Sequence, residues 1–188
     1  MLFLYGTYSN KNTLSEENAE LSLDFAVPMI YIDNWKKCGL VANFFGQYQS
    51  VSFKKHREKV NSILSTITNE LLENAVKFAC DKALEIHLRL KKQSDTISIE
   101  TYNVSTKENA EKLIKFTETL AKDTPENIFL KTIEENSTKE EMSELGLITI
   151  FKDYSDQIGI KITKENQKND TYAININLQI NEKALINI

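Results

Sequence analysis

The sequence predicts an α+β fold, specifically a two-layer α/β sandwich in which helices cover one face of a mostly antiparallel sheet. Two observations lead to this prediction. Apolar residues recur at helical spacing through the first half of the chain, and after residue 82 they alternate with polar residues instead. Four alternating segments, each with one apolar face, fit a sheet that is covered on one side only.

The 188 residues and their 41% hydrophobic content fit a single folded domain. Residues 1–20 begin with a short apolar stretch and continue as a polar segment rich in Asn, Ser and Glu. We expect residues 1–20 to be a flexible lead-in and residues 21–188 to form the domain.

An extended segment and a helix are predicted before the long helix. Residues 21–32 have the composition of extended chain, interrupted by Pro28. Asp33 and Asn34 are residue types that begin helices. The residues after them place a largely aromatic face at helical spacing, made of Trp35, Cys38, Leu40, Val41, Phe44, Phe45 and Tyr48.

The long helix is predicted from about His56 to Lys82. Its apolar stripe consists of Val60, Ile63, Leu64, Ile67, Leu71, Ala75 and Phe78. The alternating segments that follow predict strands over residues 84–91, 97–102, 158–162 and 172–180.

A long insertion, residues 103–154, separates the second and third of these strands. Ser105 and Glu108 have the spacing of a capping box, so an amphipathic helix is expected to begin there and run through residues 113–120. Residues 123–144 are dense in Glu, Lys, Asn and Thr. We expect this polar, helix-breaking connection to act as a movable flap.

The most informative segment lies within the long helix and reads Asn-Glu-Leu-Leu-Glu-Asn-Ala-Val-Lys-Phe, residues 69–78. At about 100° per residue, Glu70, Asn74 and Lys77 fall within roughly 60° of one another, beside the apolar stripe. Asn74 therefore lies at the boundary between core and solvent, where an amide oxygen could coordinate a cation. An amphipathic helix with an ordinary polar flank is the alternative explanation.

The wording of this segment resembles the N-box of the GHKL ATPase superfamily, which includes gyrase, Hsp90, histidine kinases, MutL and the anti-sigma serine kinases. The resemblance implies a Bergerat-type fold over about residues 55–180, with Mg and ATP as cofactors. It implies that Asn74 binds the magnesium ion of Mg-ATP, that Glu70 is the catalytic general base, and that Lys77 contacts phosphate.

The remaining motifs of the family are only partly matched. Asn103 stands where the family has the adenine-binding aspartate of an Asp-x-Gly-x-Gly motif, and both glycines are missing. An asparagine oxygen can still accept a hydrogen bond from the adenine amino group. Residues 143–148 match the later glycine-rich box, where Gly146 and Leu147 would meet nucleotide at a helix start. Gly146 is equally well explained as a simple loop-to-helix turn.

One branch of the superfamily shares these departures. The segments Trp-Lys-Lys-Cys-Gly-Leu at 35–40, Tyr-Asn-Val at 102–104 and Leu-Gly-Leu at 145–147 look like the bacterial SiaB-like regulators. These are small GHKL proteins of partner-switching pathways that combine a kinase, a SpoIIE-type phosphatase and a small phosphorylatable antagonist protein. The resemblance implies the antagonist and the phosphatase pathway as partners, and a homodimer as in the anti-sigma kinases.

Two functions remain open at this stage. The first is an ATP-dependent serine/threonine protein kinase with a degenerate ATP site, in which Glu70 activates the hydroxyl of the partner. The second is a non-catalytic GHKL-fold module that binds a partner protein, favoured by the missing glycines and by the aromatic residues around Trp35 and Phe44. An unrelated two-layer domain with a coincidental N-box is the third reading.

Composition restricts the partners further. A net charge of -4 and a pI near 5.4 argue against non-specific nucleic-acid binding. Cys38 and Cys80 have no metal-ligand or redox spacing, which is typical of reduced thiols in the cytoplasm. The apolar stretch at residues 1–5 is too short for a signal peptide or a membrane span, so we expect a cytoplasmic protein without membrane contact.

Overall fold

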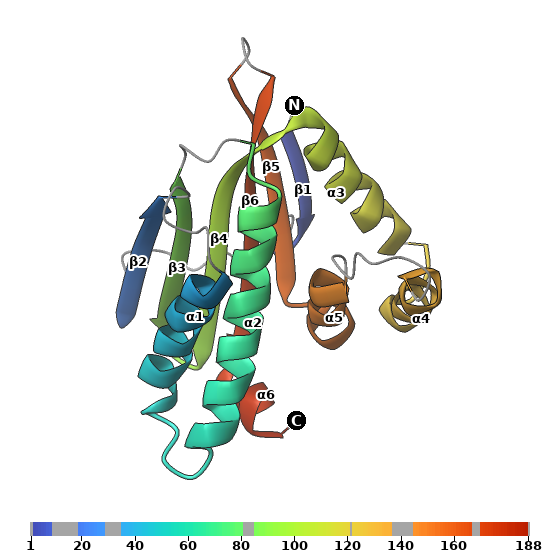
Figure 1. The fold of residues 1–188 in the computed structure, drawn as a ribbon. Helices are drawn as coiled ribbons and strands as arrows, with labels where there is room; N and C mark the ends of the chain where they lie inside the picture. Colours follow the sequence, from blue (N-terminus) through green and yellow to red (C-terminus); the bar gives the residue numbers. More distant parts are fainter. Residues whose placement is uncertain are drawn as a thin grey trace.

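The computed structural model describes residues 2–8, 19–28, 35–80, 85–120, 122–136, 145–166 and 170–187. In this part of the chain, six strands form one antiparallel sheet in the order β1-β5-β6-β4-β3-β2, and helices pack on it (Figure 1). The predicted α+β sandwich with an antiparallel sheet is confirmed.

The strands follow one another in pairs along the chain, with helices between the pairs. The strands are β1 Leu2–Gly6, β2 Leu21–Pro28, β3 Glu85–Gln93, β4 Thr96–Thr106, β5 Ile158–Asn166 and β6 Thr171–Asn181. The described helices are α1 Trp35–Ser50, α2 Arg57–Lys77, α3 Lys107–Leu120, α4 Pro125–Asn136, α5 Leu145–Tyr154 and α6 Glu182–Asn187.

All four predicted strands are present, as β3 to β6, and β2 occupies the predicted extended segment up to Pro28. The edge strand β1 differs from the expectation, because residues 2–6 belong to the segment assigned to a flexible lead-in. They pair with β5 instead. Gly6 ends β1 with a φ of +59°, and a Cβ there would lie 1.9 Å from the carbonyl oxygen of Ile158. Residues 9–18 lie outside the described residues.

The core lies between α2 and the sheet. Alternate residues of β4 and β6 face the helices, so one face of each strand is apolar and buried. Leu64 and Leu71 of α2 pack there with Leu88, Ile99 and Leu178, all fully buried. Each such leucine or isoleucine side chain contributes roughly 1.5–3 kcal/mol by leaving water.

Two helix boundaries differ from the sequence prediction. Helix α2 ends at Lys77 rather than Lys82. Helix α3 is capped by Thr106, whose Oγ1 accepts a hydrogen bond from the Asn109 N–H at 3.2 Å. Ser105 does not cap α3, because its hydroxyl donates to the carbonyl oxygen of Phe78.

The expected helix-breaking connection also contains a helix, α4. Thr124 caps it by accepting a hydrogen bond from the Asn127 N–H at 3.3 Å. Ile128 is 7% exposed and packs in the core, so this connection contributes to the core, which its polar composition did not predict. Residues 137–144 of the predicted flap, and the predicted helix start at Asp33 and Asn34, lie outside the described residues.

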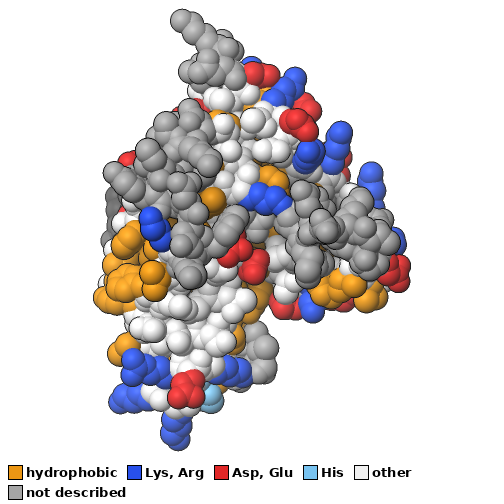
Figure 2. Space-filling model, viewed as in Figure 1, with side chains coloured by type: hydrophobic (Ala, Val, Ile, Leu, Met, Phe, Trp, Pro, Cys, Tyr) orange, Lys and Arg blue, Asp and Glu red, His pale blue; other side chains and the backbone are white. Residues whose placement is uncertain are grey.

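One face of α1 is exposed and apolar. We call this surface the α1 stripe; Figure 2 shows hydrophobic side chains gathered on the α1 side of the molecule. Its residues are Phe25 of β2, Leu40, Phe44 and Tyr48 of α1, and Val51, each 42–68% exposed. Among the described residues, no helix combines the length and hydrophobicity that crossing a membrane would require.

Candidate functional site

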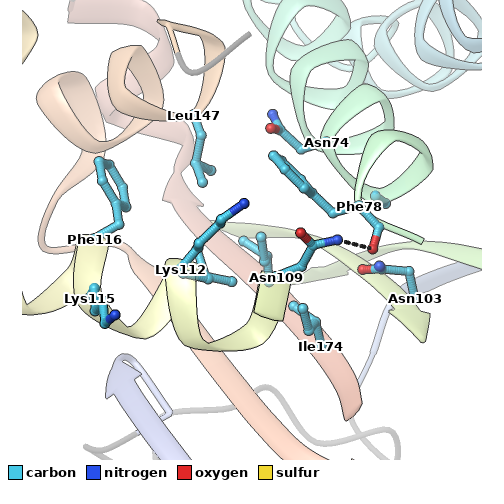
Figure 3. A pocket seen from close by; sticks show the side chains of 12 residues that line it. Asn74, Phe78, Asn103, Asn109, Lys112, Lys115, Phe116, Leu147 and Ile174 are labelled. Atoms are coloured by element: carbon cyan, nitrogen blue, oxygen red, sulfur yellow. Dashed lines mark hydrogen bonds between the residues drawn. The ribbon is translucent and has the colours of Figure 1, made fainter. Parts of the chain in front are cut away.

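A cavity of about 380 Å³ lies between α2, α3, α5 and the sheet (Figure 3). Its volume is within the range of small-molecule sites. The lining residues are Asn74, Ala75 and Phe78 at the end of α2; Asn103 of β4; Asn109, Lys112, Leu113, Lys115 and Phe116 of α3; Leu147 of α5; and Ile174 and Ile176 of β6.

The end of α2 is tied to the end of β4, and this connection forms one wall of the cavity. Ala79 and Ser105 make an isolated antiparallel bridge, and the Cys80 N–H donates to the Val104 carbonyl at 2.9 Å. Ser105 and Asn109 both direct side-chain donors to the Phe78 carbonyl. Two segments distant in sequence are therefore held side by side.

Asn74 is 8% exposed and lines the cavity, as a ligand-binding residue should. Its Nδ2 donates to the main-chain carbonyl of Glu70 at 2.7 Å. The bond fixes the amide and leaves Oδ1 as the acceptor. A neutral amide oxygen beside a cavity fits magnesium, which prefers oxygen ligands and keeps others from water and phosphate. Asn74 would supply the only protein ligand that the resemblance assigns.

Glu70 lies one helical turn before Asn74 and touches the start of α5. A Cβ added at Gly146 would lie 1.7 Å from Oε2 of Glu70, so the carboxylate rests where a side chain would otherwise stand. Burial raises the pKa of Glu70, and the charge of Glu73 raises the pKa further. Neither Glu70 nor Gly146 lines the cavity itself, but each adjoins a lining residue, Asn74 and Leu147 respectively.

Asn103 lies on the sheet floor of the cavity and is 4% exposed. It pairs with Ile174 of β6 and faces the helices, as do Thr101 and Ser105 on the same strand. Asn74 of α2 and Asn103 of β4, which are 29 residues apart in the sequence, therefore line the same cavity.

Lys77 is placed differently from the other predicted site residues. Its side chain is exposed, its Nζ lies 5.4 Å from the ring centroid of Phe78, and it does not line the cavity. The structure thus brings together Asn74, Asn103 and Leu147, adds Glu70 and Gly146 beside them, and leaves Lys77 outside.

Sequence reasoning missed the contribution of α3. Asn109, Lys112, Leu113 and Phe116 line the cavity and follow the i, i+3, i+4, i+7 pattern of one helix face. The pattern is present in the sequence, but its polar members, Asn109 and Lys112, were not predicted as site residues. In Figure 3 the Lys112 side chain reaches from α3 toward the opening between Leu147 and Phe78.

Acidic, histidine and cysteine side chains do not form a metal centre in the described part of the chain, where no group of three or more of them is close enough to hold an ion.

Comparisons with known proteins bear on the fold. No protein-family model matches the chain, and no curated protein matches it. Among solved structures, a chain in the crystal structure of the SiaB–SiaC complex from Pseudomonas aeruginosa is similar, with a TM-score of 0.60 and 13% sequence identity. The match covers 84% of this chain and 89% of that chain. At this identity the likeness establishes a shared fold.

Proposed function

We propose that this chain is a GHKL-type regulator of a bacterial partner-switching pathway, which binds Mg-ATP in the cavity and phosphorylates a serine or threonine of a small partner protein. One observation carries the proposal: Asn74 and Asn103, from two separate motifs, line the same cavity, and the Glu70 carboxylate lies one helical turn away. The shared fold with a chain of the SiaB–SiaC complex, a complex of two proteins, supports a regulatory role through a protein partner.

The proposed binding mode follows the chemistry of the cavity walls. The floor is apolar, with Ile174 and Ile176, and suits a flat base. Asn74 and Lys112 lie on the helix walls, where an oxygen ligand and a positive charge suit metal-bound phosphates. Lys112 also forms an exposed i,i+4 ion pair with Glu108 at 2.8 Å.

Glu70 is the proposed base. Its raised pKa makes the carboxylate a stronger proton acceptor than an ordinary surface glutamate. In the reaction, the hydroxyl proton of the partner moves to Glu70, the γ-phosphoryl group moves from ATP to the hydroxyl oxygen, and ADP leaves. The match to the glycine-rich box at residues 143–148 keeps only Gly146. This predicts slow turnover, because phosphoryl transfer depends on positioning and charge neutralisation.

A second function is favoured by the α1 stripe. Exposed aromatic side chains that contact one another, such as Phe44 and Tyr48 with ring centroids 6.0 Å apart, are enriched at protein interfaces. A non-catalytic module would use this surface to bind its partner and would have no need of phosphoryl transfer. The resemblance implies a homodimer, and we propose the α1 stripe as the surface through which it would form.

Thermal unfolding with and without Mg-ATP tests nucleotide binding. A ligand that binds only the folded state at 100 times its Kd stabilises by about 2.7 kcal/mol, which raises the midpoint by several degrees. Asn74→Ala should lose this shift. The matched control is Asn69→Ala on the same helix, because Asn69 donates to Glu73 and does not line the cavity. No shift of the parental protein at millimolar Mg-ATP would overturn the proposal.

Transfer of labelled phosphate from ATP to co-purified proteins tests catalysis. Glu70→Gln should lower the rate by at least about 100-fold and leave Mg-ATP binding intact, since a general base contributes 10²–10⁴-fold. A rate equal to that of the parental protein would exclude Glu70 as the base. Nucleotide binding without transfer by the parental protein would favour the non-catalytic module.

A further inference from the structure

Three asparagines line the cavity, and they differ in the use of their amide groups. Asn74 donates to the Glu70 carbonyl at 2.7 Å, and Asn109 points its amide nitrogen at the Phe78 carbonyl at 3.5 Å. Asn103 is different, because its Nδ2 is shielded from solvent and has no hydrogen-bond partner within the described residues. Figure 3 shows Asn103 near the end of the Asn109–Phe78 bond without joining it.

An unsatisfied amide of this kind is costly. Leaving a buried donor without a partner costs about 1–3 kcal/mol, so such groups in folded proteins call for an explanation. Asn103 is 4% exposed and lies beside Ile174 on the apolar floor. Its polar neighbours on the same face of β4 are Thr101 and Ser105. Ser105 already donates to Phe78. Asn103 lines the cavity, so a ligand bound there would lie next to its amide.

The end of the ligand that meets Asn103 is set by the charge of the cavity. Lys112 and the Asn74 oxygen lie on the helix walls, where phosphates and their metal fit, while the floor around Asn103 is apolar. A nucleotide would therefore place its base on the floor and its phosphates toward α2 and α3. Because the 6-substituent of a purine lies on the edge away from the sugar and phosphates, that edge would face the amide.

We propose that Asn103 reads the 6-position of a purine with either end of its amide, so that the cavity accepts 6-amino and 6-oxo purine nucleotides alike. This inference rests on the proposed function. A 6-amino group donates to Oδ1, and a 6-oxo group accepts from Nδ2; a half-turn of the amide exchanges the two. No protein group fixes Nδ2, so neither orientation is excluded. A carboxylate at this position only accepts and would repel a 6-oxo group.

The test compares Mg-ATP with Mg-ITP, because hypoxanthine differs from adenine at the edge that Asn103 would read and lacks the extra 2-amino group of guanine. Dissociation constants are measured by calorimetry at pH 8, which favours the ionised form of a substituted aspartate. Magnesium tripolyphosphate gives the affinity of the phosphates alone. The parental protein should bind ATP and ITP within about fivefold of each other, and both at least about tenfold more tightly than tripolyphosphate.

Two variants sharpen the result. Asn103→Asp should keep ATP binding and lose at least about tenfold in ITP binding, since its carboxylate cannot donate. Asn103→Leu should weaken ATP and ITP by similar factors and unfold at or above the parental midpoint, because it removes a buried donor that lacks a partner.

The outcomes separate this inference from the proposed function. Strong ATP binding with ITP more than about fivefold weaker would overturn the inference and leave the proposed function standing. Equal affinities of both nucleotides and tripolyphosphate would overturn it as well, because the base would then not be read. An Asn103→Asp variant that binds ITP like the parental protein would exclude Asn103. Absence of all binding would remove the proposed function itself.

Discussion

Glu70 carries a charge in a place that disfavours it. Burial and the neighbouring Glu73 both raise the pKa of Glu70 above its ordinary value. The folded state therefore holds the proton of Glu70 more tightly than the unfolded state does. This contribution to stability is fully present below the ordinary carboxyl pKa and is lost as the pH rises through the raised pKa of the folded state.

We predict that Glu70→Gln, which cannot ionise, is more stable than the parental protein at pH 7. The difference in the free energy of unfolding should shrink as the pH falls through the raised pKa of Glu70. Urea unfolding at pH 7 and at pH 4 measures both values. A variant that is less stable at pH 7 would show that the Glu70 carboxylate makes a favourable interaction that outweighs its burial.

Gly146 is a second position at which a single added carbon atom should change the candidate site. A Cβ at Gly146 would lie 1.7 Å from Oε2 of Glu70, and the displaced group is the end of a flexible side chain. We predict that Gly146→Ala moves the Glu70 carboxylate, changes the free energy of unfolding by less than about 1 kcal/mol, and slows phosphotransfer. Denaturation and the labelled-phosphate assay measure these effects.

The double variant Gly146→Ala/Glu70→Gln is the control for this prediction. If Gly146 affects catalysis only by giving room to the Glu70 carboxylate, Gly146→Ala should not slow phosphotransfer further in the Glu70→Gln background. Additive losses in the double variant would instead mean that the start of α5 contributes to binding on its own.

Helix α1 packs closely on α2, and one of its two glycines allows this. A Cβ at Gly46 would lie 2.8 Å from the main-chain oxygen of Asn61 and 2.1 Å from Ser65 Oγ. At Gly39 the nearest such atom, Asn69 Oδ1, is 3.9 Å away. The same residue type therefore has a packing role at one position and none at the other.

These two glycines form a matched pair. Gly46→Ala should destabilise by about 1–3 kcal/mol, because the backbone of α2 cannot move aside easily. Gly39→Ala should stabilise by about 0.5–1 kcal/mol, since alanine is the better residue in a helix interior. Chemical denaturation of both variants tests the pair, and a loss of stability at Gly39 would contradict the proposed geometry.

The elements themselves show where local patterns suffice and where they fail. The period of apolar residues predicted α2 and strands β3 to β6, because each buries one face and the spacing of that face is local. It missed α4, in which Ile128 is buried but the equally apolar Leu130 and Ile133 are exposed. It also placed the cap of α3 at Ser105, because the sequence does not reveal that Phe78 lies near enough to bind that hydroxyl.

At the scale of the whole molecule, the α1 stripe and the cavity are separate features. The stripe follows α1 and the edge strand β2, whereas the cavity is enclosed by the end of α2, α3, α5 and the sheet (Figures 1 and 2). Binding of a partner protein and binding of a nucleotide should therefore be separable by mutation.

We predict that Phe44→Ser weakens partner binding or self-association by at least about tenfold and leaves the Mg-ATP shift unchanged, because Phe44 is 46% exposed at the centre of the stripe. Leu130→Ser is the control, as Leu130 is 58% exposed on α4. Analytical ultracentrifugation and co-purification measure the effect. Equal behaviour of the two variants would exclude the stripe as the interface.

The sequence by itself determined the fold class and the buried face of α2, because each follows from the spacing of apolar residues within one segment. The assignment of Glu70 and Asn74 to an N-box stays a prediction. Only the tertiary structure decided that Asn103 and the polar face of α3 share a cavity with Asn74, that Gly146 makes room for Glu70, and that Lys77 stays outside. Contacts between segments depend on how the helices lie on the sheet, and no local period encodes that arrangement.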